Sequence, residues 1–134
     1  MAKTAGKIVG VEIVPQAVEN AGKNAESNNI TNAEFHCGDS GEVFAKLRSS
    51  GCDPDIIVLD PPRKGCSEET LQTVCVAQPD KIVMISCNPS TAARDAKWLS
   101  NNGYSTVKVC GFDLFPRTRH VECVVLMSRV NPEK

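Results

Sequence analysis

Short apolar runs alternate with amphipathic stretches along most of the chain. The runs are rich in Ile and Val, which is typical of strands, whereas the stretches between them carry apolar residues at helical spacing. Val18, Ala21 and Ala25 show that spacing after the first run. The pattern predicts strands over 7–13, 33–37, 55–60, 81–86, 105–110 and 120–127, and helices over 15–28, 42–48, 67–76 and 89–101.

Capping and turn residues mark the ends of several of these elements. Pro61 stops the strand before it, because proline lacks the backbone donor that a strand needs. Ser67 is a suitable N-cap and is followed by two glutamates, which favour a helix start. Asn88 followed by Pro89 gives the same signal for the last helix, and Gly103 ends it.

The order of the elements predicts the fold class. Strands that alternate with helices favour a largely parallel α/β sheet that is covered on both faces, with right-handed crossovers. The last two strands are joined only by residues 111–119. Because that connection is too short for a crossover helix, we expect the last strand to run antiparallel to its predecessor.

Composition places the chain among ordinary globular domains. It has 134 residues, of which 41% are hydrophobic and 23% charged, so we expect one domain over 1–134 with one core. No apolar run approaches the ~20 residues of a membrane span, and the N-terminus lacks a secretory signal. The seven cysteines form no Cys-x-x-Cys pair, so neither a disulfide framework nor a metal site is indicated. We therefore expect a cytoplasmic protein with no metal and no membrane partner.

The charge balance gives little sign of a nucleic-acid partner. The formal net charge is -1, whereas nucleic-acid-binding domains usually show a basic patch or stripe. A local cluster at Arg117, Arg119 and His120 is either such a patch or a solvated loop.

Ligands of open parallel sheets bind beyond the carboxyl ends of the strands, and Glu12, Asp39, Asp60 and Cys87 all follow predicted strands. An acid placed like Glu12 commonly accepts hydrogen bonds from ribose hydroxyls, although it also serves as a helix-entry acid. The glycine-rich loop that precedes such an acid by ~20 residues would fall before residue 1. Residues 6–10 do not replace it, because they lead into a strand.

Three further positions carry candidate chemistry. The prolines after Asp60 fix the backbone so that its carboxylate can project into the crevice, although they also make a rigid turn. Cys87 precedes a predicted helix start, where partial positive charge favours a thiolate; the alternative is a packing role. Glu122 at the start of the last strand is a candidate base or an edge-strand charge.

Three motifs in this order and spacing resemble the RNA 5-methyluridine methyltransferases: Val58-Leu-Asp-Pro-Pro-Arg-Lys-Gly65, Ile85-Ser-Cys-Asn-Pro-Ser-Thr91 with Arg94-Asp95, and Phe115-Pro with His120-Val-Glu-Cys123. The resemblance covers about residues 2–127. It implies a Rossmann-like fold, S-adenosylmethionine as cofactor and an RNA uridine as acceptor. Lys64-Gly65-Cys66 leans toward the bacterial 23S ribosomal RNA branch, with the transfer RNA branch as the alternative.

The resemblance also implies residue roles. Cys87 matches the nucleophile that adds to uracil C6, and Glu122 matches the base that removes the C5 proton. Glu12, Asp39 and Asp60 match the polar positions that line the S-adenosylmethionine pocket.

The implied chemistry makes demands on the RNA and on the fold. The uridine must be unstacked or flipped to reach the thiol, and Arg63, Arg117 and Arg119 are candidate phosphate contacts. Residues 2–7 resemble the tail of the helix after the glycine-rich loop, so we expect a catalytic domain truncated at its N-terminus, without its first strand. Such a gap leaves a sheet position open and favours self-association.

Other functions remain open on the sequence alone. Amino-group methyltransferases carry an aromatic residue after Asp-Pro-Pro, so Arg63 argues against methylation of an exocyclic amine. A Rossmann-like binding module without activity would keep the same motifs. A nicotinamide dehydrogenase lacks a use for the residues around Cys87 and needs the glycine loop.

Overall fold

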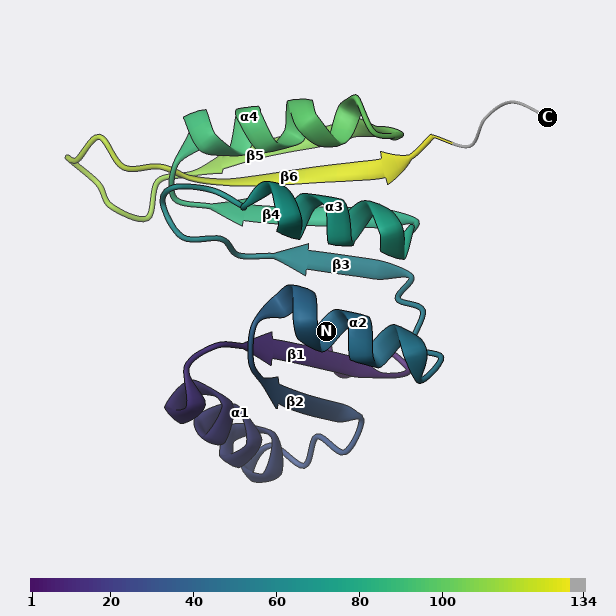
Figure 1. The fold of residues 1–134 in the computed structure, drawn as a ribbon. Helices are drawn as coiled ribbons and strands as arrows, with labels where there is room; N and C mark the ends of the chain where they lie inside the picture. Colours follow the sequence, from purple (N-terminus) through teal and green to yellow (C-terminus); the bar gives the residue numbers. More distant parts are fainter. Residues whose placement is uncertain (131–134) are drawn as a thin grey trace. The chain divides into compact units, whose positions relative to one another are not determined.

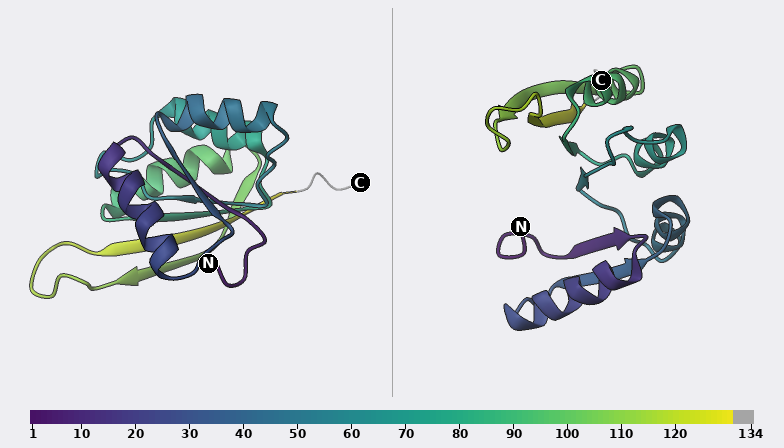
Figure 2. Two further views of the ribbon diagram at one scale, coloured as in Figure 1. Left: turned by 90° about the horizontal axis from the view of Figure 1, so that it is seen from below. Right: turned by 90° about the vertical axis from the view of Figure 1, so that its left-hand side faces the viewer.

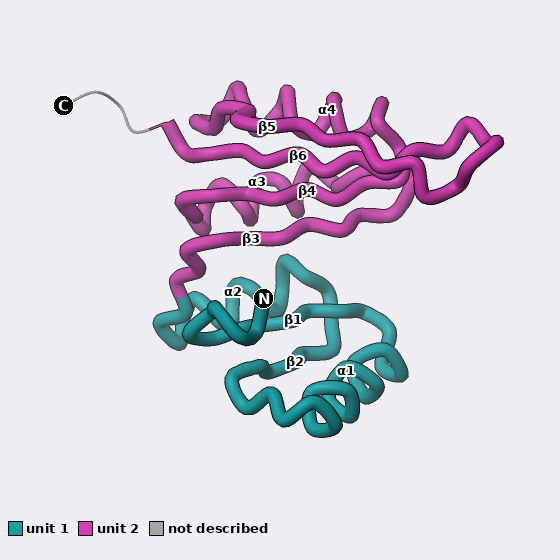
Figure 3. Tube along the Cα trace, turned by 180° about the vertical axis from the view of Figure 1, so that it is seen from behind, with its two compact units in different colours: residues 1–52 teal, residues 53–134 magenta. Residues whose placement is uncertain are grey.

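The computed structural model describes residues 1–130, which divide into two compact units, 1–52 and 53–130 within the described range (Figure 3). The sequence predicts one sheet and one core. Hydrogen bonding instead gives a two-stranded sheet in the first unit and a four-stranded sheet in the second. Strands β1 (Ile8–Glu12) and β3 (Ile56–Leu59) are among the edge strands of these sheets, and each has one hydrogen-bonded neighbour among the described residues.

The first unit is a β-α-β-α segment. Strands β1 (Ile8–Glu12) and β2 (Ala33–Cys37) pair in parallel, from Ile8 opposite Ala33 to Glu12 opposite Cys37. Helix α1 (Pro15–Ser27) connects them, and α2 (Ser40–Ser49) follows β2. A Cβ atom on Gly10 would lie 2.7 Å from Cδ1 of Phe35, so glycine is needed where the ring crosses β1.

The second unit carries a four-stranded mixed sheet in the order β3-β4-β6-β5 (Figure 1). Strands β3 (Ile56–Leu59) and β4 (Lys81–Ser86) are parallel, whereas β6 (Glu122–Arg129) runs antiparallel to both β4 and β5 (Tyr104–Phe112). The antiparallel last strand that the sequence predicts is confirmed. Helices α3 (Glu68–Ala77) and α4 (Pro89–Ser100) contact each other and lie on the same face of this sheet (Figure 2).

The core of the second unit lies between its sheet and these two helices. Alternate residues of β4 and β6 are buried there, including Ile82, Met84, Val125 and Met127. The opposite face is not covered within this unit, and Ile56 remains 54% exposed. Within this unit both helices pack on one side of the sheet.

The predicted elements occur in the predicted order, with shifts at their ends. Helix α2 begins at Ser40 and not at residue 42, because the carboxylate of Asp39 caps it. Strand β5 is longer than predicted, and β6 begins only at Glu122, because residues 115–118 form a turn. Both N-caps read from the sequence, Ser67 and Asn88, accept backbone hydrogen bonds in the structure.

Candidate functional site

The carboxyl ends of β3 and β4 meet the start of β6 in the second unit. Ser86 pairs with Cys123 in the antiparallel β4–β6 ladder. The next residues along the two strands, beyond the last paired positions, are Cys87 and Glu122. The electrostatics of Cys123 agree, because burial raises the pKa of its thiol and the charges of Glu122 and Cys87 raise it further. The two residues that the sequence selects as nucleophile and base therefore stand at adjoining ends of β4 and β6.

The backbone around Cys87 is held by its neighbours. Buried Ser86 uses its hydroxyl twice on Asn88, accepting from the backbone N–H and donating to the carbonyl, both at 3.2 Å. Asn88 in turn caps α4 by accepting from the N–H of Ser90 at 3.1 Å. Cys87, partly exposed, thus sits at the N-terminus of a fixed helix, where the helix dipole favours an anion.

The loop after β3 joins both sides of this site. The carbonyl of Arg63 accepts hydrogen bonds from Nδ2 of Asn88 at 3.1 Å and Oγ1 of Thr91 at 3.3 Å. Its guanidinium lies 3.0 Å from Nδ1 of His120, two residues before Glu122. Arg63 therefore links the helix start beside Cys87 to the strand start beside Glu122.

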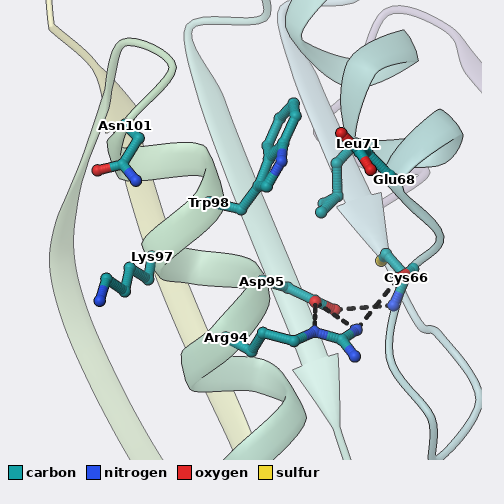
Figure 4. Close-up of a pocket in the computed structure, with 8 residues that line it drawn as sticks. All are labelled: Cys66, Glu68, Leu71, Arg94, Asp95, Lys97, Trp98 and Asn101. Carbon is teal, nitrogen blue, oxygen red and sulfur yellow. Dashed lines mark hydrogen bonds and ion pairs between the residues drawn. The ribbon is translucent and has the colours of Figure 1, made fainter.

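A buried carboxylate fastens the same loop to α4 (Figure 4). Asp95 is 1% exposed, accepts a hydrogen bond from the N–H of Cys66 at 2.7 Å and forms an ion pair with Arg94. Arg94 also donates to the carbonyls of Lys64 and Cys66, at 3.1 and 3.2 Å. We call this set, Lys64, Cys66, Arg94 and Asp95, the loop latch. The pocket drawn in Figure 4 opens beside it, between α3 and α4.

The loop latch also defines the chemistry of Cys66. Burial first, and then the negative charge of Asp95, raises the pKa of its thiol to about 11. A thiol of that kind stays protonated at neutral pH and is a poor nucleophile. Cys66 is therefore a structural cysteine.

Gly65 is required where the loop latch closes. Its φ is +82°, and an added Cβ would lie 2.7 Å from Oδ2 of Asp95. We expect Gly65→Ala to lower the free energy of unfolding by more than the ~1–3 kcal/mol of a strained backbone conformation, because the carboxylate must also move. Denaturant titration measures this. Gly103→Ala is the matched control, since Gly103 has φ +94° but no atom within 4 Å of its Cβ position; equal losses for both variants would contradict the prediction.

The two candidates of the first unit, Glu12 and Asp39, stand at the carboxyl ends of β1 and β2. Glu12 is exposed and its Oε1 accepts from the N–H of Val14 at 2.9 Å, as a helix-entry acid does. Asp39 accepts from the N–H groups of Gly41 and Glu42 at 2.8 and 3.3 Å. Both contacts fall on Oδ1, which leaves Oδ2 for a ligand.

Asp60 differs from these two acids. It is exposed directly after β3 and has no hydrogen-bond or ion-pair partner within 1–130.

Sequence reasoning finds Asp60, Cys87 and Glu122 but gives no role to Asp95 and does not foresee the contact between Arg63 and His120. The only signal for the loop latch is the glycine at 65, which does not by itself reveal its partner.

Two searches of the described residues gave no site. Across 1–130 no group of three or more His, Cys, Asp or Glu is placed to hold a metal ion. In the same range no helix is both long and apolar enough to cross a bilayer.

Comparisons with known proteins agree with the motifs. Residues 1–130 match the family model described as tRNA (uracil-5-)-methyltransferase. An RNA methyltransferase of Bacillus cereus, named as uncharacterised, is 52% identical over 130 residues, which are 97% of this chain and 28% of that protein. A relative from Clostridium acetobutylicum with the same description is 46% identical over 98% of the chain.

Solved structures give the same fold. The tRNA (uracil-54, C5)-methyltransferase of Pyrococcus abyssi, crystallised with S-adenosyl-L-homocysteine, superposes with a TM-score of 0.79 at 34% identity, over 94% of this chain and 30% of that one. An rRNA methylase from Streptococcus thermophilus superposes with a TM-score of 0.72 at 8% identity, over 97% of this chain and 77% of that one, which bears on the fold alone. The chain spans under a third of the length of the curated relatives described above.

Proposed function

The chain belongs to the RNA (uracil-5-)-methyltransferase family, and on that premise we propose that residues 1–134 are part of one catalytic domain that methylates C5 of a uridine in RNA. The observation that carries the proposal is the β4–β6 register, which pairs Ser86 with Cys123, so that Cys87 directly follows the end of β4 where Glu122 begins β6. A nucleophile and a base so placed can act on adjacent atoms of one pyrimidine ring. A binding module without activity has no need of this pair.

The proposed reaction uses Cys87 first. C5 of uracil is a weak carbon nucleophile, and addition of a thiolate to C6 activates it. The sulfur electron pair forms the S–C6 bond, and the C5–C6 π pair moves onto the C5–C4–O4 system as an enolate. C5 then becomes nucleophilic enough to accept a methyl group.

Glu122 completes the proposed cycle as general base. After methylation C5 carries both the methyl group and its original proton. The carboxylate of Glu122 takes that proton, the C5–H electron pair re-forms the C5–C6 double bond, and the S–C6 bond breaks to return Cys87 as a thiolate. Helix α4, capped by Asn88, favours the anion both before addition and after release.

We propose S-adenosylmethionine as the cofactor. It supplies an electrophilic methyl group on a sulfonium. Glu12, Asp39 and Asp60 would hold it, because each leaves carboxylate oxygen at the end of a parallel strand for hydroxyl or amino donors. The unpartnered carboxylate of Asp60 is the feature of this structure that best fits such a ligand.

The acceptor we propose is 23S ribosomal RNA, with transfer RNA as the alternative. The Lys64-Gly65-Cys66 continuation favours ribosomal RNA. Gly65 and Cys66 also have a structural role in the loop latch. Methylation of transcripts of both kinds separates the two, and exclusive activity on transfer RNA would overturn our choice.

Binding of S-adenosylhomocysteine tests the proposed class without RNA. We expect saturable heat in calorimetry with S-adenosylhomocysteine and none with NAD. The three carboxylates can accept hydrogen bonds from the hydroxyl and amino groups of S-adenosylhomocysteine. The pyrophosphate of NAD is bound by a glycine-rich loop, and residues 1–130 show none. Asp60→Asn should weaken binding, whereas Asp55→Asn, before β3, is the control. Selective binding of NAD would contradict the proposal.

Two further proposals concern the state of the protein. The free edges of β1 and β3 make self-association between copies plausible on physical grounds, and a sedimentation coefficient independent of concentration would refute it.

All seven cysteines are unpaired, which supports a reducing compartment such as the cytoplasm. Cell fractionation tests that location.

A further inference from the structure

The connection between β5 and β6, residues 113–121, stands beside the proposed catalytic pair. Strand β5 runs parallel to β4, since both are antiparallel to β6, so this connection emerges at the same end of the sheet as Cys87. It extends beyond the other loops of that end (Figures 1 and 2). Glu122 follows it directly. Residues 113–121 therefore lie at the end of the sheet to which an RNA would have to bring a uridine for Cys87 to reach it.

A rigid turn at the tip presents an arginine. The N–H and hydroxyl of Thr118 both donate to the carbonyl of Phe115, at 3.1 and 2.7 Å. Pro116 occupies the second position, and Arg117 has φ +67°, which together indicate a type II turn. That third position normally carries glycine or asparagine, because a side chain there strains the backbone. An arginine at a position where its side chain costs stability points to a function for that side chain.

The same turn carries a partly exposed aromatic ring, Phe115, two residues before Arg117. Phe115 is 48% exposed, and its ring makes an edge contact with His120, with centroids 6.4 Å apart at an interplanar angle of 83°. Nδ1 of His120 lies 3.0 Å from the guanidinium of Arg63, so Phe115 is connected through His120 to the loop after β3. With nearly half of its surface exposed, Phe115 is accessible to a ligand.

The charges of this segment favour an anionic partner. Neither Arg117 nor Arg119 has a hydrogen-bond or ion-pair partner within the described chain, and both are exposed. Asp113 is the only acid between residues 113 and 121. An exposed aromatic ring and unpaired guanidinium groups on one short connection are features that bind single-stranded nucleic acid, by stacking a base and pairing with a phosphate.

We propose that residues 113–121 form an RNA platform on which a base flanking the target uridine stacks against Phe115 while Arg117 holds a neighbouring phosphate. The proposal rests on the function proposed above. It assigns a second RNA contact, separate from the reacting atoms, and explains the strained arginine. Stacking of the neighbour would also help to keep the target uridine unstacked.

Fluorescence anisotropy with a short labelled single-stranded RNA that contains one 5-fluorouridine measures the platform directly. Phe115→Ala should weaken binding by about 5- to 150-fold, which is the range for loss of one base stack. Arg117→Ala should lower the slope of log affinity against log salt by about one. Val109→Ala and Lys108→Ala, at exposed positions on β5, are the controls and should bind as the unsubstituted chain does.

An abasic RNA locates the stacked nucleotide. If the base beside 5-fluorouridine stacks on Phe115, removal of that base and replacement of Phe115 should each weaken binding by a similar factor. The two changes made together should then weaken binding by little more than either change alone. Independent, multiplying effects at every flanking position would overturn the proposal. So would tighter binding of anionic lipid vesicles than of RNA, with the same dependence on Phe115 and Arg117.

Arg117→Gly separates the role of the side chain from its effect on the fold. Glycine relieves the positive φ, so the thermal midpoint should rise or stay unchanged, while RNA affinity falls as in Arg117→Ala. A midpoint that rises with unchanged affinity would show that Arg117 has no RNA contact. Adduct formation at saturating 5-fluorouridine RNA is followed in parallel: an adduct with unaltered affinities refutes only the platform, whereas no adduct together with the expected changes in affinity refutes only the proposed reaction of Cys87.

Discussion

Cys87→Ser should abolish methylation of RNA and formation of the covalent complex with 5-fluorouridine RNA. Serine keeps the size and the hydrogen-bonding capacity of the side chain, but its hydroxyl is not ionised at neutral pH and does not add to C6. Loss of a covalent nucleophile typically costs at least about 10⁴-fold in kcat. A methyl-transfer assay and denaturing gel electrophoresis of the trapped complex measure the two effects.

Cys110→Ser is the control for this substitution. Cys110 is partly exposed on β5 of the same sheet, and it has no part in the proposed chemistry. We expect its activity and trapping to match the unsubstituted protein. A trapped complex that persists in Cys87→Ser but disappears in Cys110→Ser would show that Cys110 and not Cys87 is the nucleophile, and would overturn the mechanism.

Glu122→Gln should separate addition from release. The amide cannot accept the C5 proton, so Cys87 should still add to the ring and the methyl group should still transfer, but the methylated adduct should persist. Loss of a general base typically lowers turnover by about 10²- to 10⁴-fold. With ordinary uridine RNA, the covalent complex should therefore accumulate in this variant, and mass spectrometry of the complex should show the added methyl group.

Glu69→Gln serves as the matched control, because Glu69 is an exposed acid on the first turn of α3. It should turn over normally and accumulate no complex. If Glu122→Gln instead fails to form any adduct, its carboxylate acts before methyl transfer, and another group removes the C5 proton.

Local chemistry in the sequence accounts for most of the secondary structure. The prolines after β3 and the caps Ser67 and Asn88 set element ends that the structure reproduces, because each acts within one or two turns of the chain. The short 111–119 connection likewise predicts the antiparallel pairing of β5 and β6. Local signals are weaker at the start of α2 and of β6, and there the observed ends differ from the predicted ones.

Sequence motifs also identify Asp60, Cys87 and Glu122 as candidates for the site, because residue type and position after a strand are visible in the chain. How these residues meet is not visible. Cys87 and Glu122 become neighbours only through the β4–β6 register, which depends on burying Met84 against Val125 on the helix side of the sheet. A shift of one residue would have turned that face outward and separated the pair.

The sequence by itself therefore determined the family and the order of helices and strands, and it supplied the candidates Asp60, Cys87 and Glu122, since these follow from short-range patterns. Only the tertiary structure decided the loop latch around Asp95, the contact between Arg63 and His120, and the strained turn that presents Arg117. Each joins segments distant in the chain or fixes a backbone angle that no single residue specifies. Such features arise from packing and long-range hydrogen bonds, whose partners a linear pattern does not name.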